Sequence, residues 1–287
     1  MIKSYYECGP CILRQVKEVI DLSTNDENLK FELMQNCMIH MAENFNKNSQ
    51  PNKIATEVNQ YIKQKTQCVN PYSKQKEMSN EIALSMIDNV QEILKTNDSL
   101  ETYVKVAIVG NILDFGPYSI STDFKTLIKD NLNRELSIND TDEFERALDF
   151  HDDVLYLADN SGEIVFDRLL IEKILDYDVN VTVAVKSSPI VNDACTKEAV
   201  EAGLHEFGEI ITVGSDSGGI VEEMFSPEFR KVFDESSLIV SKGLANYEGL
   251  TEMDLAGKDV FALLCTKCNL ISKNLSVDIN SLILKKI

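Results

Sequence analysis

Polar side chains that could bind a metal ion or a phosphate follow three short apolar runs in the second half of the chain. The segments concerned are 159–163, 186–193 and 242–248. Asp159, Asn160 and Asp193 offer two carboxylates and a carboxamide, an all-oxygen set that suits a hard cation such as Mg²⁺ or Mn²⁺. The sequence therefore predicts that these three residues bind a divalent cation, with coordination positions left for water and phosphate.

Lysines and glycines in the same segments fit a phosphate ligand. Lys186 and Lys242 would neutralise phosphate oxygens, while Gly162 and Gly243 would let the backbone approach closely. Any one such segment is also typical of an ordinary turn or helix cap. Three of them at separate strand ends favour a functional site, because ligands of open α/β sheets bind at the carboxyl ends of the strands.

The elements that would position these residues alternate between short apolar runs and amphipathic stretches. The apolar runs are 154–158, 181–185, 210–213, 238–240 and 260–264. Amphipathic stretches such as 164–175 and 194–202 separate them, which indicates βαβ units. Residues 149–287 are therefore expected to form an α/β region with a mainly parallel sheet and flanking helices, and to bind the metal and the phosphate.

The first half of the chain is expected to be mainly helical, over residues 1–148. Apolar residues recur there at helical spacing, as in Ile12, Val16, Val19 and Ile20. The run 104–111 suits a buried strand or a buried helix, and we favour the helix.

Composition limits the class of protein and its partners. The chain has 287 residues, 44% of them hydrophobic and 26% charged, as in ordinary globular proteins. Its net charge of -19 argues against nucleic-acid or membrane binding, although a bound cation would still permit a small phosphorylated substrate. Without an apolar signal region or spanning segment, and with an odd count of seven cysteines, the chain is expected to be cytoplasmic with free thiols.

Several of these segments together resemble a known family. The segments 159–163, 189–194 and 241–248 look like signature blocks of the DUF89 family, the damage-control phosphatases. The segments 110–116 and 8–11 resemble that family's prokaryotic, cysteine-containing branch. The resemblance spans nearly the whole chain, and five blocks in the family's order are far more specific than any one of them.

The resemblance implies a metal-dependent phosphatase with a helical N-terminal region and a Rossmann-like α/β region. It implies that Asp159, Asn160 and Asp193 hold the metal (Mg, Mn, Co or Ni) and that Lys242 lies at the phosphate. The substrate would be a small phosphorylated metabolite, such as a sugar phosphate or a damaged cofactor or nucleotide precursor. The residues expected at substrate or phosphate are Lys186, Lys242, Gly243, Asn246 and Asn111. Asp114 would approach the same cleft, although an Asn after Gly, as at 110–111, equally indicates a helix C-cap.

Phosphate monoester hydrolysis needs charge neutralisation and an in-line nucleophile. Asp159, Glu163 and Lys242 are the candidate catalytic residues. Water activated by Asp159 or Glu163 could attack, or Asp159 could attack directly to give an aspartyl-phosphate. We favour water, because a carboxylate committed to a metal has fewer lone pairs for attack.

Two Cys-x-x-Cys pairs stand near the ends of the chain, Cys8 with Cys11 and Cys265 with Cys268. Each pair suits half of a tetrahedral thiolate metal site. Because 254 positions separate the pairs (265 minus 11), a shared site requires the two ends of the chain to meet. A second metal site, a redox function and unligated packed thiols all remain open.

Two rival functions also remain open. An S-adenosylmethionine-dependent carboxyl methyltransferase could use the same sheet edge, but it would need a glycine-rich first loop, whereas the loop after Ala158 begins Asp-Asn. Alternatively, a non-catalytic metal- or ligand-binding protein would hold its ligand at this edge without turnover. The oligomeric state is not encoded in any pattern that we recognise.

Overall fold

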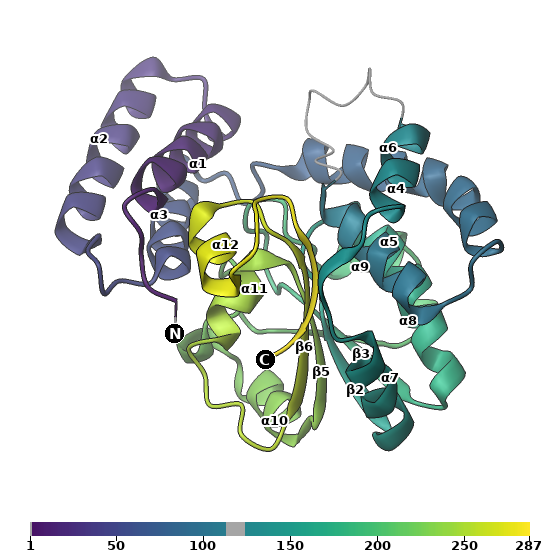
Figure 1. Ribbon diagram of the computed structural model, residues 1–287. Helices are drawn as coiled ribbons and strands as arrows, with labels where there is room; N and C mark the ends of the chain where they lie inside the picture. Colours follow the sequence, from purple (N-terminus) through teal and green to yellow (C-terminus); the bar gives the residue numbers. More distant parts are fainter. Residues whose placement is uncertain (1, 113–123) are drawn as a thin grey trace.

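The computed structural model describes residues 2–112 and 124–287, and its centre is one seven-stranded sheet (Figure 1). The strands are β1 (Leu136–Asn139), β2 (Asp153–Leu157), β3 (Asn180–Val185), β4 (Glu209–Thr212), β5 (Leu238–Lys242), β6 (Asp259–Cys265) and β7 (Leu282–Lys286). Their spatial order is β1-β7-β6-β5-β2-β3-β4. The five strands from β2 to β6 run parallel to one another, and β7 pairs with β6 in the antiparallel direction. The expected α/β fold with a mainly parallel sheet is confirmed.

The strand order reverses between β2 and β5. From β2 the chain moves outwards through β3 and β4, then returns to the other side of β2 to add β5 and β6. The adjacent strands β2 and β5 are therefore left by connections that run in opposite directions, which opens a crevice at their carboxyl ends. The segments 159–163 and 242–248 begin at this topological switch point.

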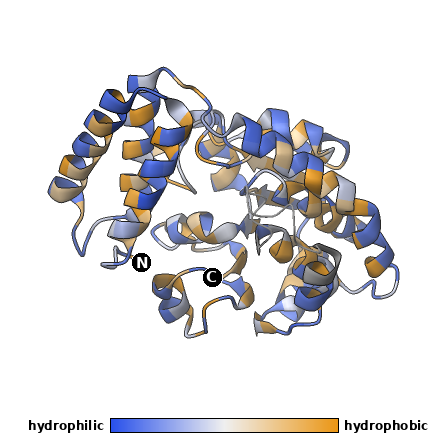
Figure 2. Cartoon of the chain, turned by 90° about the horizontal axis from the view of Figure 1, so that it is seen from above, coloured by the Kyte–Doolittle hydropathy of each residue, from blue (hydrophilic) through white to orange (hydrophobic). Residues whose placement is uncertain are grey.

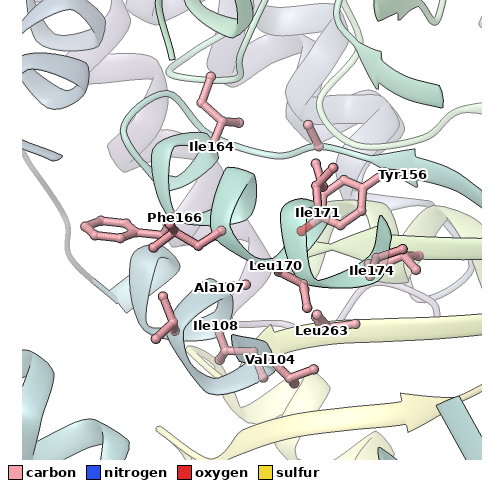
Figure 3. Close-up of a cluster of buried hydrophobic side chains, with 14 of the residues drawn as sticks. Val104, Ala107, Ile108, Tyr156, Ile164, Phe166, Leu170, Ile171, Ile174 and Leu263 are labelled. Carbon is pink, nitrogen blue, oxygen red and sulfur yellow. The ribbon is translucent and has the colours of Figure 1, made fainter. Parts of the chain in front are cut away.

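Helices cover both faces of the sheet. The helices of the α/β body are α4 (Ser73–Leu94), α5 (Leu100–Ile112), α6 (Phe124–Leu132), α7 (Thr141–Phe150), α8 (Glu163–Ile174), α9 (Thr196–Glu201), α10 (Pro227–Glu235), α11 (Gly243–Leu250) and α12 (Asn269–Leu275), with 3₁₀ turns η1 (Leu175–Tyr177), η2 (Leu204–Glu206) and η3 (Glu222–Met224). Alternate residues of β2 explain the two layers. Tyr156 packs into the core beneath α5 and α8, shown in Figure 3, whereas Leu155 and Leu157 face the core that holds Phe229 of α10.

Three helices form a separate body, which we call the three-helix lobe (Figure 1). They are α1 (Cys8–Ser23), α2 (Glu27–Asn44) and α3 (Pro51–Thr66). The lobe has its own core, in which Val16, Leu33 and Ile62 are fully buried. Helices α1 and α3 present hydrophobic residues to one side and hydrophilic residues to another (Figure 2), whereas α2 also exposes Phe31, Met38 and Ile39. The helical spacing noted around Val16 in the sequence corresponds to α1.

The sheet extends beyond the predicted α/β region. The five apolar runs correspond to β2–β6, and the run 104–111 lies in α5, as favoured. However, β1 precedes residue 148 and pairs with β7, and one core contains residues from Ala83 to Leu284. The division at residues 148 and 149 therefore does not coincide with a break in packing, because α5 and α7 lie on the sheet and α4 packs on α8. Within the described ranges, no helix is both long and apolar enough to cross a membrane.

Candidate metal and phosphate site

Backbone hydrogen bonds join the two loops that carry the predicted metal ligands. The loop after β2 and the loop after β3 meet at a β-bridge between Asn160 and Asp193. The amide of Ser161 donates to the carbonyl of Asn192 at 2.9 Å, and the amide of Ala194 donates to the carbonyl of Asp159 at 2.8 Å. The fold therefore brings Asp159, Asn160 and Asp193 together from separate strand ends.

Two carboxylates lie buried side by side at the start of α8. The side-chain amides of Asn111 and Asn160 both donate to Asp159 Oδ2, at 3.1 and 2.8 Å, and to Glu163 Oε2, at 2.7 and 3.1 Å. Burial raises the pKa of Asp159 well above its usual range, and the nearby charges of Glu163 and Asp193 raise it further. An added cation would relieve this concentration of buried negative charge.

The oxygen donors in this region fit a hard divalent cation. Among the described residues, Asp193 Oδ2 and Asn111 Oδ1 are buried without a hydrogen-bond partner. Burial raises the pKa of Asp193 to about 6, against the opposing effect of Lys186 and then of Lys76. In the parts of the chain that the structure covers, no three His, Cys, Asp or Glu side chains converge as a metal site. The fitting donor set is thus two carboxylates supplemented by carboxamides.

The two predicted phosphate-binding lysines lie beneath the site. Lys242 is 0% exposed, and its ammonium contacts Glu163 Oε1 at 2.6 Å and Asp167 Oδ1 at 2.5 Å. Lys186 is 2% exposed; its ammonium donates to the carbonyl of Gly219 at 2.6 Å and lies 3.7 Å from Asp193 Oδ2. In this arrangement both ammonium groups act as counter-ions of buried carboxylates, because their strands direct them into the protein.

A cavity of about 210 Å³, the edge cavity, opens at the sheet edge beneath the three-helix lobe. Its floor includes Asp159, Asn160 and Asp193. Its other lining residues include Gln15, Asn52, Thr56 and Asn59 from the lobe, Asn111 from α5, and Lys267. The edge cavity therefore exposes the candidate ligands to a small molecule.

Lys267 is the cation on the wall of the edge cavity that sequence reasoning missed. It is exposed, and its ammonium donates to the carbonyl of Asn111 at 2.6 Å. The strand-end rule applied elsewhere would have found it, since it follows β6 by two residues. Lys267 stands between Cys265 and Cys268, so this segment was interpreted as a thiol pair and not as a phosphate-binding segment.

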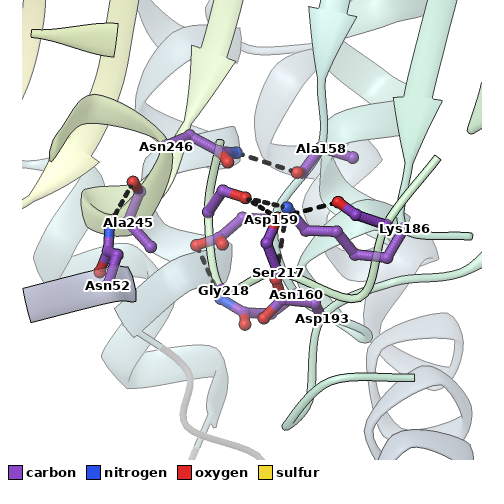
Figure 4. Close-up of polar contacts among 12 residues, drawn as sticks. Asn52, Ala158, Asp159, Asn160, Lys186, Asp193, Ser217, Gly218, Ala245 and Asn246 are labelled. Atoms are coloured by element: carbon purple, nitrogen blue, oxygen red, sulfur yellow. Dashed lines mark hydrogen bonds and ion pairs between the residues drawn. The ribbon is translucent and has the colours of Figure 1, made fainter. Parts of the chain in front are cut away.

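Gly243 and Asn246 shape the site from α11. Gly243 has a φ of 80°, and a Cβ atom built there would lie 1.8 Å from Asp159 Oδ2, so only glycine lets α11 start this close to Asp159. The side-chain amide of Asn246 donates to the carbonyl of Ala158 at 3.0 Å and to that of Lys242 at 2.8 Å, which fixes α11 against the end of β2 (Figure 4).

Polar contacts hold the three-helix lobe over the edge cavity. Asn52 donates to the carbonyl of Ala245 at 2.8 Å, a contact drawn in Figure 4, and Thr56 Oγ1 accepts from the amide of Gly218 at 3.0 Å. Lys63 contacts Asp216 Oδ2 at 2.6 Å. Access to the edge cavity therefore depends on how α3 sits on the sheet edge. Asp114, expected at the same cleft, lies outside the described residues.

The four paired cysteines do not form one cluster. Cys8, Cys11 and Cys268 line a cavity of about 200 Å³ next to the edge cavity. Cys265 instead lies in the core beneath α5, on the opposite face of the sheet from the cluster that Cys268 contacts. The two ends of the chain do meet. However, the turn after β6 carries the chain from one side of the sheet to the other within the three positions between Cys265 and Cys268, so their thiols lie apart. Burial raises the pKa of Cys8, Cys265 and Cys268, which favours the thiol form.

Comparison with known proteins identifies the family. Residues 4–283 match the damage-control phosphatase ARMT1-like domain. The chain belongs to the damage-control phosphatase family. This result confirms the DUF89 resemblance noted in the sequence and supports a phosphatase role.

Curated relatives match over nearly their whole length. An uncharacterized protein of Methanocaldococcus jannaschii is 38% identical, covering 99% of this chain and 96% of the relative. Damage-control phosphatases of Archaeoglobus fulgidus and Pyrococcus horikoshii are 31% and 30% identical, each over 97% of its own length. The crystal structure of a DUF89 family protein from Pyrococcus horikoshii superposes with a TM-score of 0.89 at 29% identity, covering 100% of this chain and 99% of that one. The Rossmann-like fold expected from the resemblance agrees with this neighbour.

Proposed function

We propose that this damage-control phosphatase family member is a metal-dependent phosphatase that hydrolyses small phosphate esters in the edge cavity. The observation that carries the proposal is the convergence of Asp159, Asn160 and Asp193 on this cavity at the β2–β5 switch point, where, among the described residues, Asp193 Oδ2 accepts no hydrogen bond and has only the Lys186 ammonium, 3.7 Å away, as its counter-ion. These three residues would hold a divalent cation (Mg, Mn, Co or Ni), with Asn111 as a further oxygen donor. When bound, the cation would supply charge neutralisation for the transferring phosphoryl group.

Lys267 is the side chain best placed to bind a phosphate oxygen. It is exposed on the cavity wall, whereas the ammonium groups of Lys186 and Lys242 are engaged with buried partners. Under this proposal Lys242 acts indirectly, by holding Glu163 in place. The predicted direct contact between Lys242 and phosphate would require its ion pairs to open.

Asp159 is a better candidate than Glu163 for activating water. Glu163 is 1% exposed and both of its oxygens accept hydrogen bonds, from Lys242 on one side and from Asn111 and Asn160 on the other. Asp159 lines the edge cavity, so it can accept a proton from a water molecule placed in line with the ester bond. Direct attack by Asp159 remains the alternative, and trapping of an aspartyl-phosphate would distinguish it.

The cavity walls favour a small, polar, non-aromatic substrate. The lobe contributes carboxamide and hydroxyl groups, as in Gln15, Asn52 and Thr56, and within the described residues 2–112 and 124–287 the lining includes no aromatic side chain on which a nucleobase could stack. Carboxamides pair well with hydroxyl groups. Among the expected substrates, sugar phosphates therefore fit better than nucleotide precursors.

Turnover of p-nitrophenyl phosphate tests the proposal. Protein freed of metal with a chelator should show no turnover, and Mg²⁺, Mn²⁺, Co²⁺ or Ni²⁺ should restore it. Undiminished turnover without metal would contradict the proposed metal dependence. Binding of S-adenosylmethionine without turnover would favour the methyltransferase, and ligand binding without turnover would favour a non-catalytic protein. A panel of sugar phosphates, nucleotides and cofactor fragments would then identify the substrate class.

A further inference from the structure

One face of α4 contacts both loops that carry the candidate metal ligands. Asn80 on this face is 3% exposed, and its carboxamide oxygen accepts a 2.6 Å hydrogen bond from the amide of Gly162. Its amide group donates to the carbonyl of Glu198 in α9 at 3.1 Å. One side chain thus links the turn that contains Asp159 and Asn160 to the helix that follows Asp193.

Lys76, one helical turn earlier on the same face, anchors the second loop. Its side chain is 0% exposed and its ammonium lies 3.1 Å from Glu198 Oε2 and 3.6 Å from Cys195 Sγ. The same carboxylate oxygen of Glu198 accepts the backbone amide of Cys195 at 2.9 Å, which closes a capping box at the start of α9. Cys195 is only two residues from Asp193, so the ion pair fixes the chain just beyond that ligand.

The hydrogen bond from the Gly162 amide to Asn80 satisfies a backbone donor at the start of α8 that has no acceptor within the helix. Gly162 has a φ of 80° and is the N-cap residue of α8, so its amide points away from the helix that it begins. Asn80 reaches this amide across 82 residues of sequence. Mutation of the buried polar groups that orient ligating side chains typically lowers metal affinity or activity by about 10–100-fold.

We propose that Asn80 and Lys76 are positioning residues that set the separation and orientation of the loops carrying Asp159, Asn160 and Asp193. The inference rests on the proposed function in one respect, namely that these three residues bind a cation. Neither α4 residue touches the edge cavity, so both act through the loops. The sequence gives no sign of this, because Lys76 and Asn80 occur in an amphipathic helix without a recognisable motif.

Variants of α4 test the proposal with matched controls on the same helix. Asn80→Leu removes both hydrogen bonds, Asn80→Asp keeps the acceptor for Gly162 but removes the donor, and Lys76→Met removes the ion pair. Asn89→Leu and Lys74→Met make the same chemical changes at exposed positions of α4. Each variant is assayed for its unfolding temperature, for Mn²⁺ affinity by calorimetry, for kcat and KM, and for backbone amide exchange over residues 158–163 and 192–198 without metal.

We expect Asn80→Leu and Lys76→Met to bind Mn²⁺ about 10–100-fold more weakly and to lose kcat by a similar factor, at a temperature where they are folded. Amide exchange should accelerate in both segments for Asn80→Leu. Asn80→Asp should retain protection at Gly162 and recover part of the affinity. The controls should match the wild type in every assay. Folded Asn80→Leu with unchanged exchange and unchanged Mn²⁺ affinity would overturn the proposal.

The assays separate this inference from the proposed function. If the wild type binds no divalent cation and hydrolyses no phosphate ester, the proposed function fails, while amide exchange still decides whether α4 orders the two loops. If Asn80→Leu does not fold, Asn80→Asp and Lys76→Met decide in its place. A fall in unfolding temperature with unchanged metal affinity in these folded variants would show that α4 only stabilises the fold, and would overturn the inference.

Discussion

The buried ion pairs of Lys242 predict that Lys242→Met loses a large part of its folding free energy. Lys242, Glu163 and Asp167 are 0%, 1% and 0% exposed, and the lysine ammonium contacts both carboxylates within 2.6 Å. Methionine preserves most of the side-chain volume but removes the charge. The two carboxylates would then be buried without their counter-ion, in a cluster that already raises the pKa of Asp167 to about 7 through burial.

Removing one partner of a buried ion pair costs about 3–5 kcal/mol of folding free energy. For a domain of this size, that loss lowers the unfolding temperature by roughly 6–20 °C. The loss should shrink on acidification. Because the folded-state pKa of Asp167 is raised, the folded state binds more protons than the unfolded state, so the stability of the variant falls as pH rises towards and beyond 7.

Thermal and urea unfolding at pH 5.5 and pH 8 measure both effects. Lys231→Met is the matched control, because Lys231 is exposed and its pair with Glu235 is a surface contact at 3.9 Å, worth about 0.5 kcal/mol or less. If Lys242→Met unfolds within about 1 kcal/mol of the wild type at pH 8, the counter-ion role is wrong. A direct phosphate role for Lys242 would then regain support.

Two further substitutions probe the candidate site, and a third probes Glu248 in the neighbouring cavity. Gly243→Ala should weaken Mn²⁺ binding measurably, because its Cβ would displace Asp159; Gly257→Ala, with a similar φ of 81° and no neighbour within 4 Å, controls for the backbone strain of about 1–2 kcal/mol. Lys267→Met should lower kcat/KM for a phosphate ester by about 10²-fold with little change in unfolding temperature. Burial raises the pKa of Glu248 to about 7, so the contribution of this group to stability is fully present below about pH 4.5 and is lost as pH rises through 7. Glu248→Gln should flatten that pH dependence in thermal unfolding.

Each of these three predictions has a result that would contradict it. Equal Mn²⁺ affinity for Gly243→Ala and Gly257→Ala would show that Asp159 tolerates displacement. Unchanged kcat/KM in Lys267→Met would remove that residue from phosphate binding. A Glu248→Gln variant whose stability still falls between pH 5 and pH 8 as in the wild type would assign the pH dependence to other groups.

The sequence predicted the framework of the site because buried parallel strands are apolar along their whole length. Runs such as 154–158 stand out for this reason, and polar residues at their ends mark the sheet edge. The short strand β1 alternates buried and more exposed residues, so it presents no continuous apolar run. The strand β7 does have one, at 282–284, but it is only three residues long and two lysines follow it. Both strands were missed, and with them the extent of the sheet.

Side-chain direction was the part that sequence could not supply. A lysine after a strand can point into the edge cavity or into the core, and Lys242 points into the core because Glu163 and Asp167 lie one helical turn apart on α8. Cys265, the last residue of β6, and Cys268, at the start of α12, likewise pack into cores on opposite sides of the sheet. The contribution of α4 depends on contacts between residues more than 80 positions apart, which no local pattern encodes.

Calorimetric titration of Mn²⁺ into the metal-free wild type and Asp159→Ala, paired with p-nitrophenyl phosphate turnover, tests the central claim most directly. Asp152→Ala is the control, since Asp152 is exposed just before β2, at the opposite end of the strand from Asp159. The wild type and Asp152→Ala should bind one Mn²⁺ and turn over substrate, whereas Asp159→Ala should do neither, even in excess metal. Wild-type binding and turnover in folded Asp159→Ala would contradict the account.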